Sequence, residues 1–185
     1  MIRKSKKKED ELEWVKEALM ELELIVDSSE KSRERPKESE KQEKYYSGKK
    51  KKHTFKNQII TTPKGTEIVD VIIGERGPLS DINLLNKQRE NFKDNQYFQG
   101  YKADQGAERT STPKKKPRKK EMPEEIKEKN QQKAQKRIFV EHVIRLLKIF
   151  GIARERFRLK EKSYEKVIMV VCGLVRLRIG ALILV

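Results

Sequence analysis

Hydrophobic and polar positions follow two different periods along this chain, and the periods predict where helices and strands lie. Residues 9–22 carry apolar side chains at helical spacing, among glutamates and lysines, and predict an amphipathic helix. These side chains are Leu12, Val15, Leu19 and Leu22. The apolar run that follows predicts a short strand over Leu24–Asp27, which ends at Asp27. Residues 28–44 are densely charged and contain a proline, a composition typical of a loop.

Two further runs have the composition of strands and predict a hairpin. They cover residues 53–62 and 67–73, and the turn sequence Thr62-Pro63-Lys64-Gly65 lies between them. Ser80 has the chemistry of a helix N-cap, and Asp81 would lie in the first turn of a helix that ends near residue 91.

The second half of the chain predicts a short strand and two long helices. The strand is expected around residues 97–101, and a loop with two prolines over 104–122 follows it. One helix is predicted over residues 123–150 and another over 164–184, with a connection between them. The order is strand, hairpin, helix, strand, helix, helix. It suits an α/β fold in which a mixed sheet is flanked by helices, with helices at both ends of the chain. The ribonuclease-H-like fold has this order.

The last helix is apolar enough to raise the question of a membrane span. Residues 167–185 have about the required length, but Arg176 and Arg178 lie at the middle. A central arginine costs about 2.5–3.5 kcal/mol for insertion into a bilayer. The sequence therefore predicts a helix packed against the core and no membrane partner.

The charge balance points to a polyanionic partner. The 185 residues contain 45 Lys and Arg against 29 Asp and Glu, a net charge of +16. Cationic side chains release counterions when they bind phosphates, so this excess favours nucleic acid. A ribosomal-type or merely soluble basic protein is the alternative. Cys172 is the single cysteine and the chain has two histidines, which excludes an internal disulfide and the usual zinc sites and fits a reducing, cytoplasmic compartment.

Two acidic positions are candidates for chemistry. Asp27 follows an apolar run, where a ligand or a turn-initiating side chain is common. Glu141 lies on one face of the predicted helix with Arg137, Arg145 and Lys148. That stripe is either a surface ladder of ion pairs, each worth a few tenths of a kcal/mol, or a carboxylate among cations that faces a phosphate backbone. The spacing alone leaves both interpretations open.

Two basic clusters are candidates for contact with DNA. The first follows two tyrosines, whose rings could stack on bases while the cations bind phosphates. A solvated run of charges is the alternative for each. The candidate residues, with two arginines of the predicted helix, are Lys49, Lys50, Lys51, Lys52, His53, Lys114, Lys115, Lys116, Arg118, Lys119, Lys120, Arg137 and Arg145.

Several ordered blocks resemble bacterial insertion-sequence transposases of the DDE type, in the group related to Harbinger transposases. The first runs from Asp27-Ser-Ser-Glu30 to Tyr45-Tyr-Ser-Gly-Lys-Lys-Lys-Lys-His-Thr54, and Gly77-Pro-Leu-Ser-Asp81 is the second. Thr112-Pro-Lys-Lys-Lys-Pro and Arg137-Ile-Phe-Val-Glu-His-Val-Ile-Arg145 resemble the third. The resemblance extends from about residue 22 to 185.

The resemblance implies a ribonuclease-H-like catalytic domain over residues 22–185, preceded by a helical remnant over 1–21. Such domains cleave DNA strands and join them at element ends and targets. Two Mg²⁺ or Mn²⁺ ions, bound by three acids, stabilise the attacking and leaving oxygens. In this reading Asp27 is the first acid and Glu141 the third.

The middle block departs from the family pattern. The family has Gly-Asp-Lys-Ala-Tyr-x-Gly, whereas this chain reads Gly100-Tyr101-Lys102-Ala103-Asp104-Gln105-Gly106, so the acid and the tyrosine have exchanged places. Tyr101 is neutral at pH 7 and a poor ligand. Asp104 is the candidate replacement, about 10 Å further along an extended chain, and Asp81 is the second choice. We therefore expect a domain of transposase ancestry with low activity.

The segment before the first acid also departs from the family. Relatives carry a helix-turn-helix region there, and this chain has only the residues from Met1 to Val26. A truncated gene or the second reading frame of a frameshifted element would explain that, and a full-length transposase or a second copy would be the protein partner. The alternative function is a basic DNA-binding remnant without catalysis.

Overall fold

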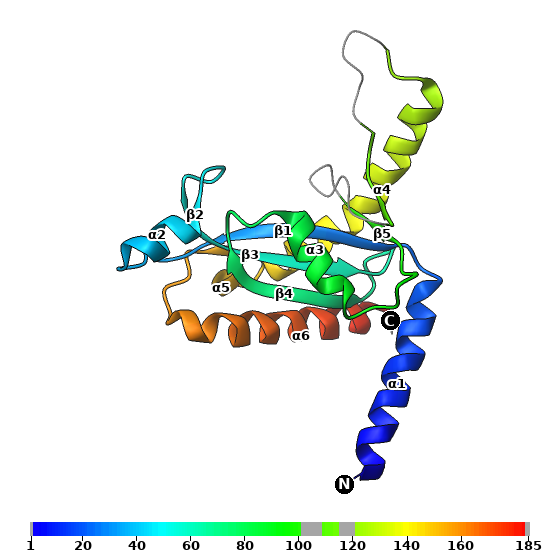
Figure 1. Cartoon of the computed structure of the whole chain (residues 1–185), viewed down its shortest axis with the longest axis horizontal. Coiled ribbons are helices and arrows are strands. Elements are labelled where there is room, and N and C mark those ends of the chain that lie inside the picture. Colours follow the sequence, from blue (N-terminus) through cyan, green and yellow to red (C-terminus); the bar gives the residue numbers. More distant parts are fainter. Residues whose placement is uncertain (1, 101–108, 115–120, 184–185) are drawn as a thin grey trace.

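A computed structural model describes residues 2–100, 109–114 and 121–183 of the chain. Figure 1 shows a central sheet with helices on both faces, while α1 and the first half of α4 extend beyond it. The strands are β1 Leu24–Ser32, β2 Tyr46–Ser47, β3 Lys52–Thr61, β4 Ile68–Arg76, β5 Phe98–Gln99 and β6 Thr110–Ser111. The helices are α1 Ile2–Met20, α2 Ser39–Tyr45, α3 Asp81–Arg89, α4 Glu124–Leu147, α5 Gly151–Arg154, the 3-10 turn Glu161–Ser163 and α6 Tyr164–Ile183.

The sheet is mixed, as the order of predicted elements indicates. The strand order is β2-β3-β1-β5-β6, and β4 pairs with β3. β3 is antiparallel to both of its neighbours, β1 and β4, whereas β5 is parallel to β1 and β6 is parallel to β5. The predicted α/β class is confirmed, and this order is consistent with a ribonuclease-H-like fold.

The two faces of the sheet bury different helices. Side chains along a strand alternate between faces, so Ile25 packs with α4 and α6 while Leu24 and Val26 pack on the opposite side. The first face holds the larger core, which includes Phe55, Ile59, Val140, Val143, Ile168, Val171 and Val175. The second holds Ile60, Leu85 of α3 and Phe98. α4 is therefore fixed against one face of β1 and α3 against the other face of the sheet.

Several predicted elements are confirmed. β3 and β4 form the expected hairpin, and β5 lies within the expected strand over 97–101. Ser80 caps α3, since its hydroxyl accepts a hydrogen bond from the Asn83 amide at 3.4 Å. α4 occupies most of the predicted helix over 123–150.

Two predictions were wrong because polar sequence was taken for loop. β1 does not end at Asp27 but continues to Ser32. The span read as a loop, 28–44, contains this strand extension and most of α2. Polar residues stay in the strand because their backbone groups pair with β3, from Ser28 opposite Gln58 to Ser32 opposite Thr54. The N-terminal helix is also longer than expected, since α1 begins at Ile2.

The last helix packs against the core as expected. Its inner face is buried through Ile168, Val171, Cys172 and Val175, against β4 and α4. Within the described residues, the helices are too short or too polar to cross a membrane.

Gly77, directly after β4, gives the first testable prediction. Its amide donates to the Thr54 carbonyl at 3.1 Å, and a methyl group at this position would overlap the Thr54 hydroxyl. That hydroxyl donates to Glu30 at 2.8 Å. We expect Gly77→Ala to lower the free energy of unfolding by about 2 kcal/mol, measured by urea denaturation.

The control for this prediction is Gly48→Ala, because an added Cβ at Gly48 meets no atom within 4 Å. Its cost should stay within about 0.5 kcal/mol. Thr54→Ala removes the overlapping hydroxyl, so the cost of Gly77→Ala should fall by about half or more in that background. An unchanged cost would contradict the overlap as the cause.

Candidate active site

A cleft of about 500 Å³ opens beside the middle of β1. β5 pairs with β1 only at Leu24 and Ile25. This edge of β1 lies opposite the edge that pairs with β3. Within the described part of the chain, no strand pairs with it from Asp27 onward. Side chains from both faces of the sheet can therefore reach the same space. The lining residues are Asp27, Ser28, Ser29, Glu30, Lys49, Lys50, Lys56, Asp81, Glu141, Ile144, Arg145 and Lys148.

Asp27 and Glu141, the two acids singled out in the sequence, lie close together in this cleft. The Arg137 guanidinium is 3.7 Å from Asp27 Oδ2 and 3.0 Å from Glu141 Oε1. The Ser28 amide also donates to Asp27 Oδ1 at 2.9 Å. The ion pair between Arg137 and Glu141 is the first step of the predicted ladder. The same helix face also borders the cleft, and contact of this face with a phosphate backbone stays a prediction.

The electrostatic environment of Asp27 is mixed. Burial raises the pKa of its carboxyl group above the usual value, while the Arg137 guanidinium and the Ser28 amide act in the opposite direction. The carboxylates of Glu141 and Asp81 raise the pKa further because like charges disfavour ionisation. A nearby cation would therefore favour the ionised form of Asp27.

Asp81 reaches the cleft from the opposite face of the sheet. It lies in the first turn of α3, as predicted, and Lys56 Nζ approaches its Oδ1 to 3.0 Å while also donating to the Leu79 carbonyl. The buried Gln58 side chain donates to the Asp81 carbonyl at 3.1 Å and to the Ser28 hydroxyl at 3.2 Å. These contacts fix the start of α3 against β1 and hold the Asp81 carboxylate next to a cation.

The cleft has a basic rim. Lys49 and Lys50, from the turn between β2 and β3, line it, as do Arg145 of α4 and Lys148 directly after this helix. All four side chains are exposed. The structure thus brings the first basic cluster and the helix stripe to the same cleft, which the sequence could not show.

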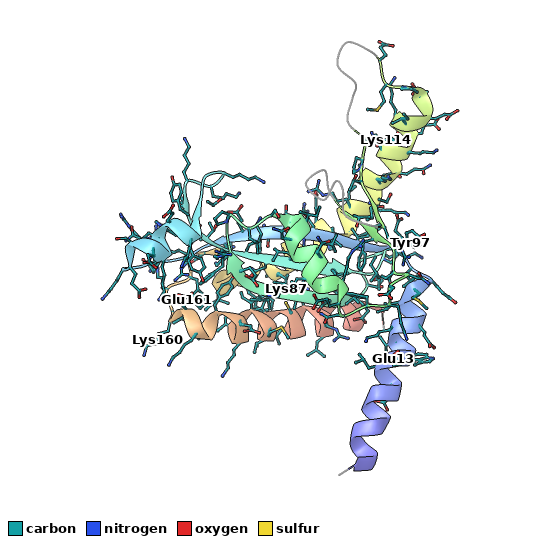
Figure 2. The ribbon with its side chains drawn as sticks, in the orientation of Figure 1. Glu13, Lys87, Tyr97, Lys114, Lys160 and Glu161 are labelled. Carbon is teal, nitrogen blue, oxygen red and sulfur yellow. The ribbon has the colours of Figure 1, made fainter. Side chains whose placement is uncertain are left out.

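The other predicted basic residues lie elsewhere or outside the described residues. Lys51, Lys52 and His53 belong to the β2–β3 hairpin without lining the cleft. Lys114 lies beside α4, where its amide donates to Asn130 Oδ1 at 2.9 Å (Figure 2). The predicted residues outside the described ranges are Tyr101, Asp104, Lys115, Lys116, Arg118, Lys119 and Lys120.

An aromatic and ionic cluster attaches the basic hairpin to the sheet. The Arg33 guanidinium lies between the rings of Tyr45 and Phe55, 4.2 and 4.3 Å from their centroids. Arg33 also donates to Glu161 at 2.8 Å, as does the Tyr45 hydroxyl. These contacts lower the pKa of Glu161. α2, and with it the turn that carries Lys49, is thereby fixed next to the end of β1.

Sequence reasoning missed Glu30 and Lys56 as cleft residues. Glu30 is next to Lys31 on β1, and Lys56 is next to Phe55 on β3. Because side chains alternate along a strand, Lys31 and Phe55 face the α4 side of the sheet, and Glu30 and Lys56 face the other side. A period-two reading of β3 would have placed Lys56 and Gln58 on one face. Glu30 was missed because its segment was taken for a loop.

The donors in the cleft suit a hard divalent cation to a limited degree. Asp27 and Glu141 offer carboxylate oxygens around one position, and the Arg137 guanidinium shows that they converge on a single cation. Mg²⁺ is commonly bound by one or two carboxylates and completes its shell with water or phosphate. The described ranges contain no cluster of three or more His, Cys, Asp or Glu side chains that could hold a metal. The described residues therefore offer two carboxylates, those of Asp27 and Glu141, as ligands for such a cation.

The mixed sheet flanked by helices is consistent with the ribonuclease-H-like class. Comparison with protein families assigns the chain more narrowly, because residues 26–176 match the family described as DDE superfamily endonuclease. The chain belongs to this family.

One curated relative supports the assignment. The chain is 32% identical over 145 residues to a protein described as a probable transposase for insertion sequence element IS702 of Microchaete diplosiphon. The matched part is 76% of this chain and 51% of the relative, so the chain spans about half the length of that protein. No solved structure gave a match.

Proposed function

We propose that residues 22–185 form the catalytic domain of an insertion-sequence transposase, which cleaves DNA strands and transfers their ends. The observation that carries this proposal is the cleft at the open edge of β1, where Asp27, Asp81 and Glu141 lie within a rim of lysines and arginine. A carboxylate site that acts on phosphodiesters repels its own substrate, and the rim offsets that repulsion.

In this proposal the basic residues of the cleft position the DNA, and the acidic residues hold the divalent cation. Lys49, Lys50, Arg145 and Lys148 would bind phosphates on either side of the scissile bond. Asp27 and Glu141 would hold a divalent cation, since DDE superfamily endonucleases generally use such ions. Mg²⁺ or Mn²⁺, two ions in the full reaction, would supply charge stabilisation for the attacking and leaving oxygens.

The position of the second catalytic acid departs from the family pattern in this chain. The family position holds Tyr101, and Asp104 is three residues further on. We propose that Asp104 substitutes only poorly for the missing ligand, so that cleavage by the natural chain is slow. Lys114–Lys116 and Arg118–Lys120 are proposed to bind DNA beyond the cleft. A full-length transposase or a second copy of this chain stays a prediction as protein partner.

Binding of DNA to the basic rim gives the experiment that tests this function. We expect Lys49→Ser/Lys50→Ser to weaken binding of a duplex oligonucleotide about tenfold near 0.1 M salt. The slope of log K against log salt should fall by about 2, since each lysine contributes about one phosphate contact. Fluorescence anisotropy over a range of salt concentrations measures both quantities.

The matched control is Lys160→Ser/Lys162→Ser, which removes the same charge from residues that do not line the cleft (Figure 2 labels Lys160). Its effect should be less than about threefold. Equal losses for the two double variants would show that only net charge matters, and would contradict the cleft as the DNA site.

A non-catalytic DNA-binding protein is the second candidate function. It is favoured by the pairing of three acids of the cleft with cations, Asp27 and Glu141 with Arg137 and Asp81 with Lys56. The two candidates differ in what divalent cations do. Metal-dependent nicking that Glu141→Gln abolishes supports the catalytic domain. DNA binding that neither metal nor Glu141→Gln changes supports the alternative.

A further inference from the structure

Arg137 contacts two acids of the cleft, Asp27 and Glu141, from within the helix that carries Glu141. Its guanidinium lies 3.0 Å from Glu141 Oε1, one helical turn away, and 3.7 Å from Asp27 Oδ2 on the neighbouring strand. The Arg137 side chain is 31% exposed and that of Asp27 is 15% exposed. The ion pair to Asp27 is therefore only partly screened by water, unlike a bridge on an open surface.

The position between the two carboxylates suits only one cation at a time. A divalent ion bound by both Asp27 and Glu141 would lie close to the guanidinium, and the two positive charges would repel each other. Asp27 Oδ1 already accepts a hydrogen bond from the Ser28 amide, so Oδ2, which faces Arg137, is the Asp27 oxygen with more capacity for an ion. Coordination of a metal by both acids and the two Arg137 ion pairs thus draw on the same two carboxylates.

We propose that Arg137 competes with the divalent cation for Asp27 and Glu141, so that metal binding requires Arg137 to release both carboxylates. The inference rests on the proposed function and adds a regulatory step to it. Arg137 neutralises the two acids until the ion arrives. Once released, its guanidinium is one helical turn from Glu141 and available to a phosphate oxygen, which Arg binds in bidentate fashion. DNA that binds the released arginine would then favour metal binding, by linkage.

Mn²⁺ titration of the full chain, followed by the electron paramagnetic resonance signal of the free ion, tests this competition. We expect Arg137→Gln to tighten the Kd for Mn²⁺ about 3- to 10-fold at constant ionic strength, the range for loss of one or two partly exposed ion pairs. Arg137→Lys keeps the charge but cannot bridge both acids with one planar group. Its Kd should lie between those of the natural chain and Arg137→Gln.

Arg145→Gln is the matched control. Arg145 lies on the same helix face and lines the same cleft, yet it forms no ion pair with another described residue. Its substitution removes the same charge, and we expect the Kd to change less than about twofold. Circular dichroism melts of each variant show whether the fold is retained, and Arg137→Lys carries the test if Arg137→Gln does not fold.

The possible outcomes distinguish failure of the competition by Arg137 from failure of the proposed metal-dependent function. Tighter binding by Arg137→Gln than by Arg145→Gln supports competition. Equal or weaker binding by Arg137→Gln, with measurable binding by the natural chain, overturns competition and makes Arg137 a support for the ligands. If neither the natural chain nor any of these variants binds Mn²⁺, the proposed metal-dependent function fails and the inference fails with it.

Discussion

The double variant Tyr101→Asp/Asp104→Tyr is expected to nick supercoiled DNA in the presence of Mg²⁺ about 100-fold faster than the natural chain, or more. The exchange restores the order of acid and tyrosine found in the family. A third carboxylate completes the set of ligands that two divalent ions need. A 100-fold gain corresponds to about 2.7 kcal/mol of transition-state stabilisation, a reasonable value for one restored ligand.

The single variants and an inactive Glu141→Gln variant serve as controls for this prediction. Tyr101→Asp alone should give most of the gain, and Asp104→Tyr alone should give none. Glu141→Gln in the double variant should return nicking to the background of the buffer, and EDTA should do the same. Fast nicking by the natural chain would show that Asp104 or Asp81 already serves as the second acid. An inactive double variant that binds DNA normally would favour the non-catalytic alternative.

Lys31→Met is expected to raise the free energy of unfolding by about 1–3 kcal/mol at pH 7. Lys31 lies on β1, is 4% exposed, and its ammonium group has no hydrogen-bond partner among the described residues. Burial lowers its pKa to about 8, with a smaller opposing effect from Glu155. Each unit of pKa shift corresponds to 1.36 kcal/mol, and methionine fills a similar volume without a charge.

The effect of Lys31→Met should depend on pH in a defined direction. Below pH 8 the lysine is protonated in both the folded and unfolded states, so the cost of burying its charge is fully present. Between pH 8 and about 10.4, the usual lysine value, the folded state loses the proton first and that cost disappears. The advantage of Lys31→Met should therefore shrink as the pH rises from 8 to 10.

Urea denaturation at pH 7 and pH 10 measures this difference. Lys166→Met is the control, because Lys166 is exposed on α6, and its effect should stay within about 0.5 kcal/mol at both pH values. A destabilising Lys31→Met would show that the ammonium group has a partner in solution, such as water from the adjacent small cavity. That cavity shares Ser29, Glu30, Ile144 and Lys148 with the cleft beside β1. Lys31 also lines that cavity, so it lies directly behind the cleft.

The hairpin and the long helices were predictable from local pattern. β3 and β4 are runs with isoleucine, threonine, valine and phenylalanine on either side of a clear turn, and α4 and α6 have long apolar stripes. Each of these elements is therefore predictable from its own residues. β1 beyond Asp27 was not predictable in this way. Its residues from Ser28 to Ser32 are mostly polar and are in a strand because β3 supplies their hydrogen-bond partners.

The sequence by itself determined the mixed α/β class, the basic character and the two acids Asp27 and Glu141, because period, composition and motif are local properties of a chain. Only the tertiary structure decided which residues meet at the cleft. Lys49 and Lys50 from a hairpin turn, Asp81 from a helix start and Arg145 from α4 line one space because β5 leaves β1 after Ile25. Their chemistry depends on that meeting, since the charge that each acid experiences comes from side chains far away in sequence.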